Sequence, residues 1–200
     1  MHRVDGAELT INEENEHRTM CLAWMQASTS TQAVFVKFAA KYNEVAHHLL
    51  APQNLPLAPA LYSCTCVIGG MYMVIMEYIP ESRGLSIHPY SLTDGSSLPQ
   101  PVLEVVCREV SKALDLLHDR GLIFGDLREL NALYLPEDGR HMSLVDFDGV
   151  GRDGVDRYST CLNPEAGLGV ARWQITEKSH DCENLERMME RLSRRVSRRH

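Results

Sequence analysis

The sequence predicts an α+β fold in two parts, in which a small antiparallel sheet with one helix precedes a reduced and mainly helical region. Short runs rich in β-branched and aromatic residues, together with a single helical segment, mark the first part. From residue 101 onward, apolar residues recur at helical spacing. Residues 80–84, with Pro80 and Gly84 at their ends, indicate a hinge. We therefore expect one part over residues 1–79 and the other over residues 80–200.

Three segments of the first part carry the predicted sheet. Residues 33–38 are rich in β-branched and aromatic side chains, as strands usually are. Residues 60–68 and 71–79 are expected to pair as a hairpin, because Gly69-Gly70 between them suits a two-residue turn that requires positive φ. Residues 1–30 are polar with weak periodicity and predict no strong strand.

Helical spacing of apolar residues marks three further segments. They are residues 41–50, residues 101–117 and a C-terminal segment from Asp181 onward. The first of these helices places one set of residues on a common face: Tyr42, Val45, Ala46, Leu49 and Leu50. Between the last two helices, residues 132–135 and 141–145 form a second predicted hairpin.

Composition restricts the class of protein. The 200 residues are 44% hydrophobic, which is enough to bury a sizeable core. A net charge of −7 argues against a general nucleic-acid surface. The basic tail from Arg194 to His200 is either a frayed, solvated terminus, which the usual behaviour of chain ends favours, or a docking or nucleic-acid patch. The six cysteines include no C-x-x-C pair, and no segment approaches the ~20 apolar residues of a membrane span. We expect a reduced, intracellular, cytoplasmic monomer without membrane contact.

Two acids and an amide form the most informative pattern. Asp126 and Asn131 precede the second hairpin, and Asp146 follows it. If Asp138-Gly139 is a two-residue turn, Asn131 faces Asp146, and both side chains can hold one Mg²⁺ ion, which prefers oxygen ligands. Asp126 then lies free to orient an attacking hydroxyl and accept its proton. Each residue alone could be a turn or cap residue; the three together indicate metal-assisted phosphoryl transfer.

The order of several short motifs resembles the protein-kinase-like superfamily over residues 30–192. The resemblance is to compact fungal kinase-like proteins and to the aminoglycoside-phosphotransferase branch. It rests on five motifs in sequence order: Val36-Lys37, Glu44, Met76-Glu-Tyr-Ile79, Gly125-Asp-Leu-Arg-Glu-Leu-Asn131 and Asp146-Phe-Asp148. It implies a two-lobed kinase-like fold that uses ATP and Mg²⁺.

The resemblance also implies roles for individual residues. Lys37 would contact the α- and β-phosphates, and Glu44 would pair with Lys37. The hinge of Glu77, Tyr78 and Ile79 would hold adenine through its backbone. Asp126 would be the catalytic aspartate, whereas Asn131 and Asp146 would be the metal ligands. Asn163-Pro164-Glu165 is similar to the motif that closes an activation segment. Asp181 is similar to an aspartate that braces the catalytic loop. A plain helix cap explains Asp181 equally well.

The sequence departs from the kinase pattern at several points. No glycine lies between Gly6 and Gly69, so a glycine-rich loop over the phosphates is missing. Phe124, Gly125 and Asp148 replace the usual histidine, arginine and glycine of their motifs, and only 16 residues separate Asp146 from Asn163. Two functions therefore stay open: a phosphotransferase acting on a hydroxyl of a protein or a small molecule, with protein favoured, and a pseudokinase that serves as a scaffold.

Overall fold

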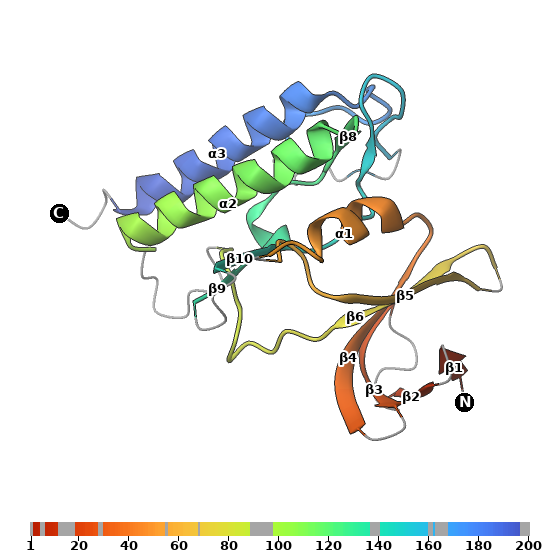
Figure 1. Cartoon of the computed structure of the whole chain (residues 1–200). Coiled ribbons are helices and arrows are strands. Elements are labelled where there is room, and N and C mark those ends of the chain that lie inside the picture. The colour runs from red at the N-terminus through yellow and green to blue at the C-terminus, as the bar shows by residue number, and fades with distance from the viewer. Residues whose placement is uncertain are drawn as a thin grey trace.

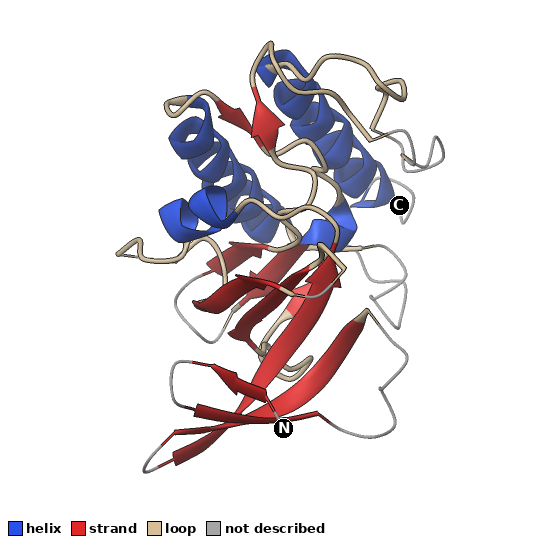
Figure 2. Ribbon diagram, turned by 90° about the vertical axis from the view of Figure 1, so that its right-hand side faces the viewer, coloured by secondary structure: helices blue, strands red, loops and turns tan. Residues whose placement is uncertain are grey.

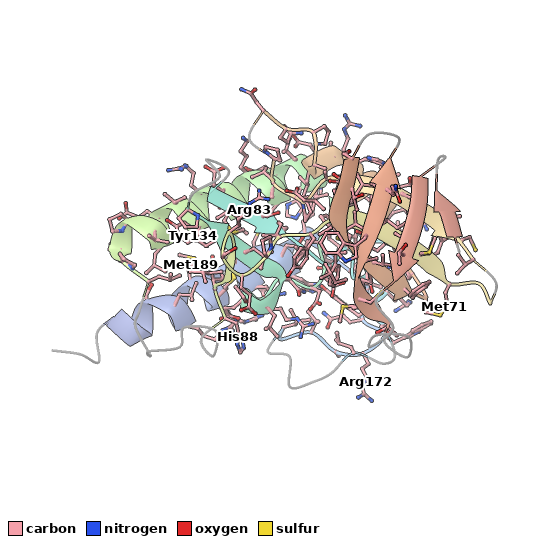
Figure 3. The ribbon with its side chains drawn as sticks, turned by 90° about the horizontal axis from the view of Figure 1, so that it is seen from below. Met71, Arg83, His88, Tyr134, Arg172 and Met189 are labelled. Carbon is pink, nitrogen blue, oxygen red and sulfur yellow. The ribbon has the colours of Figure 1, made fainter. Side chains whose placement is uncertain are left out.

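A computed structural model of the chain shows an antiparallel sheet and a helical part (Figure 1). The described residues are 2–4, 7–11, 19–27, 30–54, 56–67, 69–88, 98–136, 141–159, 162 and 168–196. Figure 2 shows the long helices at one end and the large sheet at the other. Seen from below in Figure 3, the strands near Met71 and the helix that carries Met189 lie on opposite sides of the molecule. The predicted α+β class is confirmed, and the bounds of the two parts at residues 79 and 80 stay a prediction.

Six antiparallel strands in the order β1-β2-β3-β4-β6-β5 form the large sheet. Its strands are β1 His2–Val4, β2 Ala7–Ile11, β3 Met20–Ala27, β4 Ser30–Ala39, β5 Leu61–Cys66 and β6 Tyr72–Glu77. The expectation of no strong strand before residue 30 is wrong, because β1, β2 and β3 all lie there. Pairing in register orders these strands despite their weak apolar pattern, since β1 pairs with β2, β2 with β3, and β3 with β4.

Helix α1, Glu44–Leu50, lies between β4 and β5 and begins three residues later than the sequence predicted. Asn43 caps it, since its side chain accepts a hydrogen bond from the Ala46 N–H at 2.9 Å. The buried face of α1 consists of Ala46, His47 and Leu50. Val45 is 69% exposed, so its predicted place on the apolar face is wrong.

The second part is built on two long helices, α2 Gln100–His118 and α3 Lys178–Val196, which lie side by side (Figure 1). Strand β7 Leu85–Ser86 precedes α2. Short elements connect the two helices: β8 Leu122–Ile123, a 3₁₀ helix at Glu129–Asn131, β9 Ala132–Leu135, β10 His141–Leu144 and β11 Gly151–Arg152. The predicted helices and the second hairpin are therefore present. Within the described residues, no helix is both long and apolar enough to cross a membrane.

The register of the second hairpin differs from the prediction by one residue. Ala132 pairs with Leu144, and the Val145 N–H donates to the Asn131 carbonyl at 3.0 Å. Asn131 therefore faces Val145 rather than Asp146. This register differs by one residue from the one that a two-residue turn at Asp138-Gly139 would give. The turn at Asp138-Gly139 lies outside the described residues.

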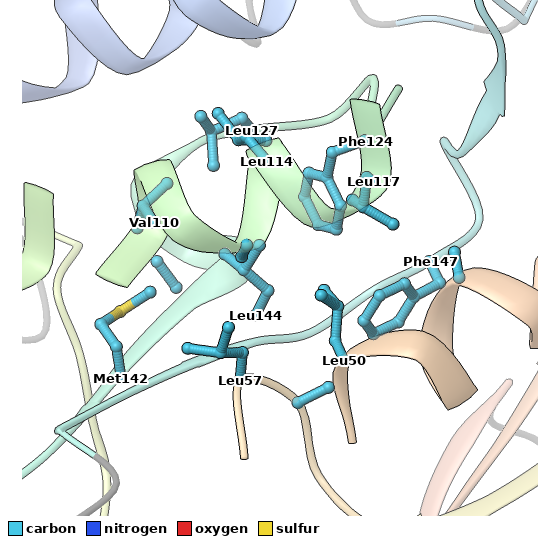
Figure 4. Close-up of a cluster of buried hydrophobic side chains, with 14 of the residues drawn as sticks. Leu50, Leu57, Val110, Leu114, Leu117, Phe124, Leu127, Met142, Leu144 and Phe147 are labelled. Atoms are coloured by element: carbon cyan, nitrogen blue, oxygen red, sulfur yellow. The ribbon is translucent and has the colours of Figure 1, made fainter. Parts of the chain in front are cut away.

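A single apolar core joins α1, α2 and the second hairpin (Figure 4). Phe124 and Phe147, both fully buried, meet edge to face with their ring centroids 5.7 Å apart. Leu50 and Leu117 enter the same cluster from α1 and α2. Phe147 follows Asp146 and Leu127 follows Asp126, and both are buried in this core, which restricts the positions of the two acids.

His47 is buried in this core as a neutral ring. Its Nε2 faces the Pro59 carbonyl at 2.8 Å, its Nδ1 contacts the Tyr42 hydroxyl, and its ring stacks on Phe147 with centroids 4.5 Å apart. The carbonyl can only accept, so Nε2 carries the proton and Nδ1 accepts from Tyr42. Burial lowers the pKa of His47 to about 4.

We predict that acid destabilises the fold through His47. The folded-state pKa lies below the unfolded value, so the folded state binds fewer protons, and stability is lost as pH falls from about 6.5 towards 4. The loss reaches about 3 kcal/mol in the free energy of unfolding. Urea unfolding at several pH values measures this loss. His47→Gln should flatten the dependence of the free energy of unfolding on pH, whereas His48→Gln, a variant of the exposed neighbour, should keep it. Equal slopes in the parent and His47→Gln would contradict this account.

Candidate active site

A cavity of about 330 Å³ lies between the large sheet and the second part of the chain. One wall comes from β4 and the residues at the end of β6, and the other from the segments that flank the second hairpin. Six of the eight predicted site residues line it: Lys37, Glu77, Tyr78, Ile79, Asn131 and Asp146. Apolar side chains such as Phe35 and Leu133 complete a surface suited to a flat, partly apolar ligand.

Lys37 forms the charged centre of this cavity. Strand β4 directs its side chain across the cavity, where Nζ lies 2.7 Å from Asp146 Oδ1 and 2.7 Å from Asp148 Oδ2. The whole residue is only 8% exposed. Burial alone would lower the pKa of the Lys37 amine, but the two carboxylates outweigh it and raise the pKa. Lys37 is therefore a cation whose position is set by acids from the other part of the chain.

Glu44 does not reach Lys37. It lies in the first turn of α1 with half of its side chain exposed, and its Oε1 is 3.4 Å from His48 Nε2. Within the described residues, the carboxylates that pair with Lys37 are those of Asp146 and Asp148. The pairing of Glu44 with Lys37 that the resemblance implies is thus absent from this arrangement.

Asp126 lies in the loop between β8 and the 3₁₀ helix, at the centre of a small polar network. Its Oδ2 accepts hydrogen bonds from Arg128 Nη2 at 3.0 Å and from Asn131 Nδ2 at 2.8 Å. Asn131 Nδ2 also donates to the Asp126 carbonyl at 2.9 Å, so both amide hydrogens are engaged. The remaining oxygen of Asn131 is then the group that can serve as a ligand. Burial raises the pKa of Asp126 to about 6, although Arg128 opposes the rise.

Asp146 has a strained backbone. Its φ of 71° lies in the left-handed region, which non-glycine residues adopt uncommonly. Phe147, buried beside it, packs against His47, Tyr42 and Phe124 and so holds the strained segment in place. Strain that the surrounding structure maintains is frequent at functional sites.

A buried aspartate on α3 anchors the loop that carries Asp126. Asp181 is fully buried and accepts hydrogen bonds from the N–H groups of Phe124 at 2.7 Å and Gly125 at 2.9 Å. His118 Nε2 lies 3.0 Å from the same carboxylate. Asp181 therefore makes the bracing contacts that the resemblance implied, rather than acting as a plain helix cap.

The close approach of two glycines explains why Gly125 replaces an arginine. Gly125 has φ 76°, and a Cβ at this position would lie 2.5 Å from the Gly149 carbonyl oxygen. A Cβ on Gly149 would lie 2.9 Å from the Asp126 Cβ. The backbone after Asp148 therefore packs directly on the loop that carries Asp126, and a larger side chain at either glycine would separate the two segments.

Two residues at the site were missed by the sequence reasoning. Arg128 lies two residues after Asp126 and pairs with it, and its position inside the Asp126–Asn131 motif was an available signal. Asp148 was noted only as a replacement for glycine, although it contacts Lys37. Asn163-Pro164-Glu165 lies outside the described residues, and so does the segment between β2 and β3 where a glycine-rich loop would be sought.

The oxygen atoms that Asn131 and Asp146 offer suit Mg²⁺ better than a metal that is held by protein ligands alone. Among the described residues, no group of three or more His, Cys, Asp or Glu side chains could hold a metal ion. Asn131 and Asp146 together offer an amide oxygen and a carboxylate on one cavity wall. Mg²⁺ usually takes only one or two such ligands and completes its shell with phosphates and water. The residues present therefore fit a metal that arrives with a nucleotide.

Two curated relatives with local sequence similarity are kinases by name. The glycogen synthase kinase-3 homolog YGK3 of Saccharomyces cerevisiae is 34% identical over 79 residues, which cover 38% of this chain and 21% of the yeast protein. The serine/threonine-protein kinase KIPK1 of Arabidopsis thaliana is 30% identical over 127 residues, which cover 64% of this chain and 13% of the plant protein. The chain thus spans only a small part of the length of either relative. No protein-family model matches the sequence.

Solved kinase structures share the fold of this chain. The structure of the Cydia pomonella granulovirus kinase PK-1 is similar with a TM-score of 0.66 and 16% identity, over 92% of this chain and 70% of the viral one. The structure of vaccinia related kinase 3 is similar with a TM-score of 0.65 and 14% identity, over 96% of this chain and 66% of the other. The chain therefore has a two-lobed protein-kinase-like fold and is locally similar in sequence to two kinases.

Proposed function

We propose that the chain is an ATP- and Mg²⁺-dependent phosphotransferase that transfers the γ-phosphate to a hydroxyl acceptor. The observation that carries this proposal is the joint lining of one cavity by Lys37, the hinge residues, Asn131 and Asp146. Neither the sheet nor the helical part alone could supply this set. Kinase names among the relatives support the proposal at a coarse level.

The apolar end of the cavity suits the adenine ring. Glu77, Tyr78 and Ile79 line this end, close to Phe35 and Leu133. The Glu77 N–H already donates to the Ala60 carbonyl at 2.8 Å, so its amide belongs to the sheet. The backbone groups of Tyr78 and Ile79 are therefore the ones we assign to adenine. Lys37 then binds the phosphates at the opposite, charged end of the cavity.

The proposed reaction is an in-line transfer in which Asp126 is the base. The acceptor hydroxyl oxygen forms a bond to the γ-phosphorus while the bond from that phosphorus to the β,γ-bridging oxygen breaks, and ADP leaves. The hydroxyl proton passes to the Asp126 carboxylate. A pKa of about 6 keeps Asp126 mostly ionised near neutral pH while making it a better proton acceptor than an exposed aspartate.

Arg128 and Lys37 would neutralise the charge on the transferred group. Arg128 Nε is buried and has no hydrogen-bond partner among the described residues. In the proposed complex, a phosphate oxygen would be that partner. Asn131 and Asp146 would hold Mg²⁺, which when bound neutralises phosphate charge and fixes the geometry of the triphosphate. We favour a protein acceptor over a small molecule such as an aminoglycoside or choline.

A pseudokinase is the second candidate function. The absence of glycine between Gly6 and Gly69 favours it, because the loop over the phosphates then lacks its usual backbone donors. In that case the fold would bind a partner protein without transferring phosphate. Measurements of nucleotide binding and of ATP turnover distinguish the two functions.

We predict that substitution of the two acids abolishes phosphate transfer without unfolding the chain. Asp126→Asn removes the base and should lower kcat by at least about 100-fold, whereas Asp146→Ala removes a metal ligand and should have a similar effect. Transfer of labelled phosphate from ATP to a panel of proteins and metabolites measures the loss. Glu104→Gln, on the exposed side of α2, is the matched control. Unchanged turnover in either variant would remove that residue from its proposed role.

We predict that ATP stabilises the fold only together with Mg²⁺. At an ATP concentration a hundred times the dissociation constant, the free energy of unfolding should rise by about 2.7 kcal/mol. Chemical unfolding with ATP, with and without Mg²⁺, measures this rise. Stabilisation without any turnover would favour the pseudokinase, and no stabilisation at all would contradict the nucleotide site.

We predict that kcat/KM falls as pH decreases through about 6. Asp126 must be ionised to accept the proton, and its raised pKa places that ionisation above the ordinary range of an aspartate. Steady-state rates between pH 5 and 8 measure the profile, with unfolding at each pH as the control for His47. A profile that stays flat down to pH 5 would show that Asp126 is not the base or that its pKa is not raised.

A further inference from the structure

We propose that Asp148 is the residue that positions the Lys37 amine, in the place that the resemblance would give to Glu44. This inference rests on the proposed function for its effect on catalysis, but not for the contact itself. It concerns a residue whose usual counterpart in kinases is glycine, which has no side chain to pair with a lysine.

The contact between Asp148 and Lys37 is as short as the contact made by Asp146. Each carboxylate has one oxygen 2.7 Å from Lys37 Nζ. The Lys37 side chain is 11% exposed, and those of Asp146 and Asp148 are 32% and 36% exposed. Charges this sheltered are screened less by solvent and salt than those of a surface ion pair.

Asp146 cannot hold Lys37 and a metal ion equally well. A carboxylate that binds Mg²⁺ loses much of its attraction for a neighbouring ammonium, because the cation neutralises its charge. Lys37 then needs a second acid to keep its amine directed at the phosphates. Asp148 is the acid already in contact with it.

The backbone around Asp148 is rigid enough for a positioning role. Phe147 before it is fixed in the core, and Gly149 after it packs against the catalytic loop at Gly125. The Asp148 N–H lies 3.4 Å from Asp146 Oδ1 in a weak hydrogen bond that further orients the two acids. Asp148 Oδ1 is buried without a hydrogen-bond partner among the described residues, so Lys37 is the cation that compensates this carboxylate.

Glu44 lies in a different environment. It pairs with His48 on the exposed side of α1, four residues along the same helix. Exposed pairs of this kind contribute little, because water screens them and the side chains lose entropy. Glu44 is thus exposed and does not contact the Lys37 amine, so it cannot fix its position. Asp148 is partly buried and contacts that amine.

Labelling of Lys37 in the nucleotide-free full chain tests the contact. Reductive methylation with formaldehyde and cyanoborohydride, followed by mass spectrometry, gives the labelling rate of Lys37 relative to Lys41 and Lys178. Asp148→Asn should raise that rate severalfold, because the amine loses one of its two carboxylates, and Glu44→Gln should leave it unchanged. Equal rates in the parent and in Asp148→Asn, or a larger effect from Glu44→Gln, would overturn the inference.

A double-mutant cycle provides a second readout that does not depend on labelling. Lys37→Met and Asp148→Asn should be non-additive in the free energy of unfolding, because each removes the partner of the other. The matched cycle of Lys37→Met and Glu44→Gln should be additive. Additivity in the first cycle would overturn the proposal even if the labelling rates differ.

Kinetics distinguish failure of this inference from failure of the proposed function. If the chain is a phosphotransferase, Asp148→Asn should lower kcat/KM for ATP by about 10- to 100-fold through misplacement of Lys37, and Asp148→Glu should restore part of it. If ATP with Mg²⁺ does not protect Lys37 from methylation, the proposed function fails, while the coupling of Asp148 to Lys37 still stands. If ATP protects Lys37 but Asp148→Asn leaves kcat/KM for ATP unchanged, Asp148 has no positioning role.

Discussion

The pairing of one lysine with acids from the other part of the chain is the constraint on which the site depends. Lys37 comes from strand β4 of the sheet, and Asp146 and Asp148 come from the segment after β10. Their contact joins the two walls of the cavity at its charged end. A half-buried ion cluster of this kind gains little net stability, because desolvation of the charges offsets their attraction. We therefore interpret it as a functional feature, which sets the position of an amine rather than the stability of the fold.

The rest of the second part holds the acids in place. Asp181 at the start of α3 holds the backbone at Phe124 and Gly125. Further along the same helix, Arg191 makes two hydrogen bonds to the buried carboxylate of Glu129, at 2.6 and 3.2 Å. Helix α3 thus contacts the chain both before and after Asp126. Such support from rigid elements is what a strained residue such as Asp146 requires if it is to keep one conformation.

Sequence patterns predicted most elements of the fold because most of them are amphipathic. Helices α2 and α3 show this. Gly69 and Gly70 have the positive φ values that were expected of them, although the pairing of Cys66 with Tyr72 differs by one residue from the register of the predicted two-residue turn. The strands before residue 30 were missed, since pairing with neighbouring strands of the sheet rather than local composition orders them. Val45 was misplaced because the cap at Asn43 sets where α1 begins and which of its faces is buried.

For the site, residue types and order predicted which side chains meet at the cavity but not which pairs they form. The hairpin register was wrong by one residue, because the length of a turn cannot be read from an Asp-Gly pair alone. Asn131 nevertheless reached the cavity, since its amide is fixed by Asp126. The pairing of Lys37 with Asp148 instead of Glu44 depends on how the sheet sits on the helical part, and no local pattern encodes that distance.

A crystal structure with a non-hydrolysable ATP analogue and Mg²⁺ tests the central claim most directly. Our account predicts adenine against Tyr78 and Ile79, the triphosphate beside Lys37, and the metal ion bound by Asn131 and Asp146. A nucleotide bound away from Lys37, or a cavity that stays empty at saturating analogue, would contradict it.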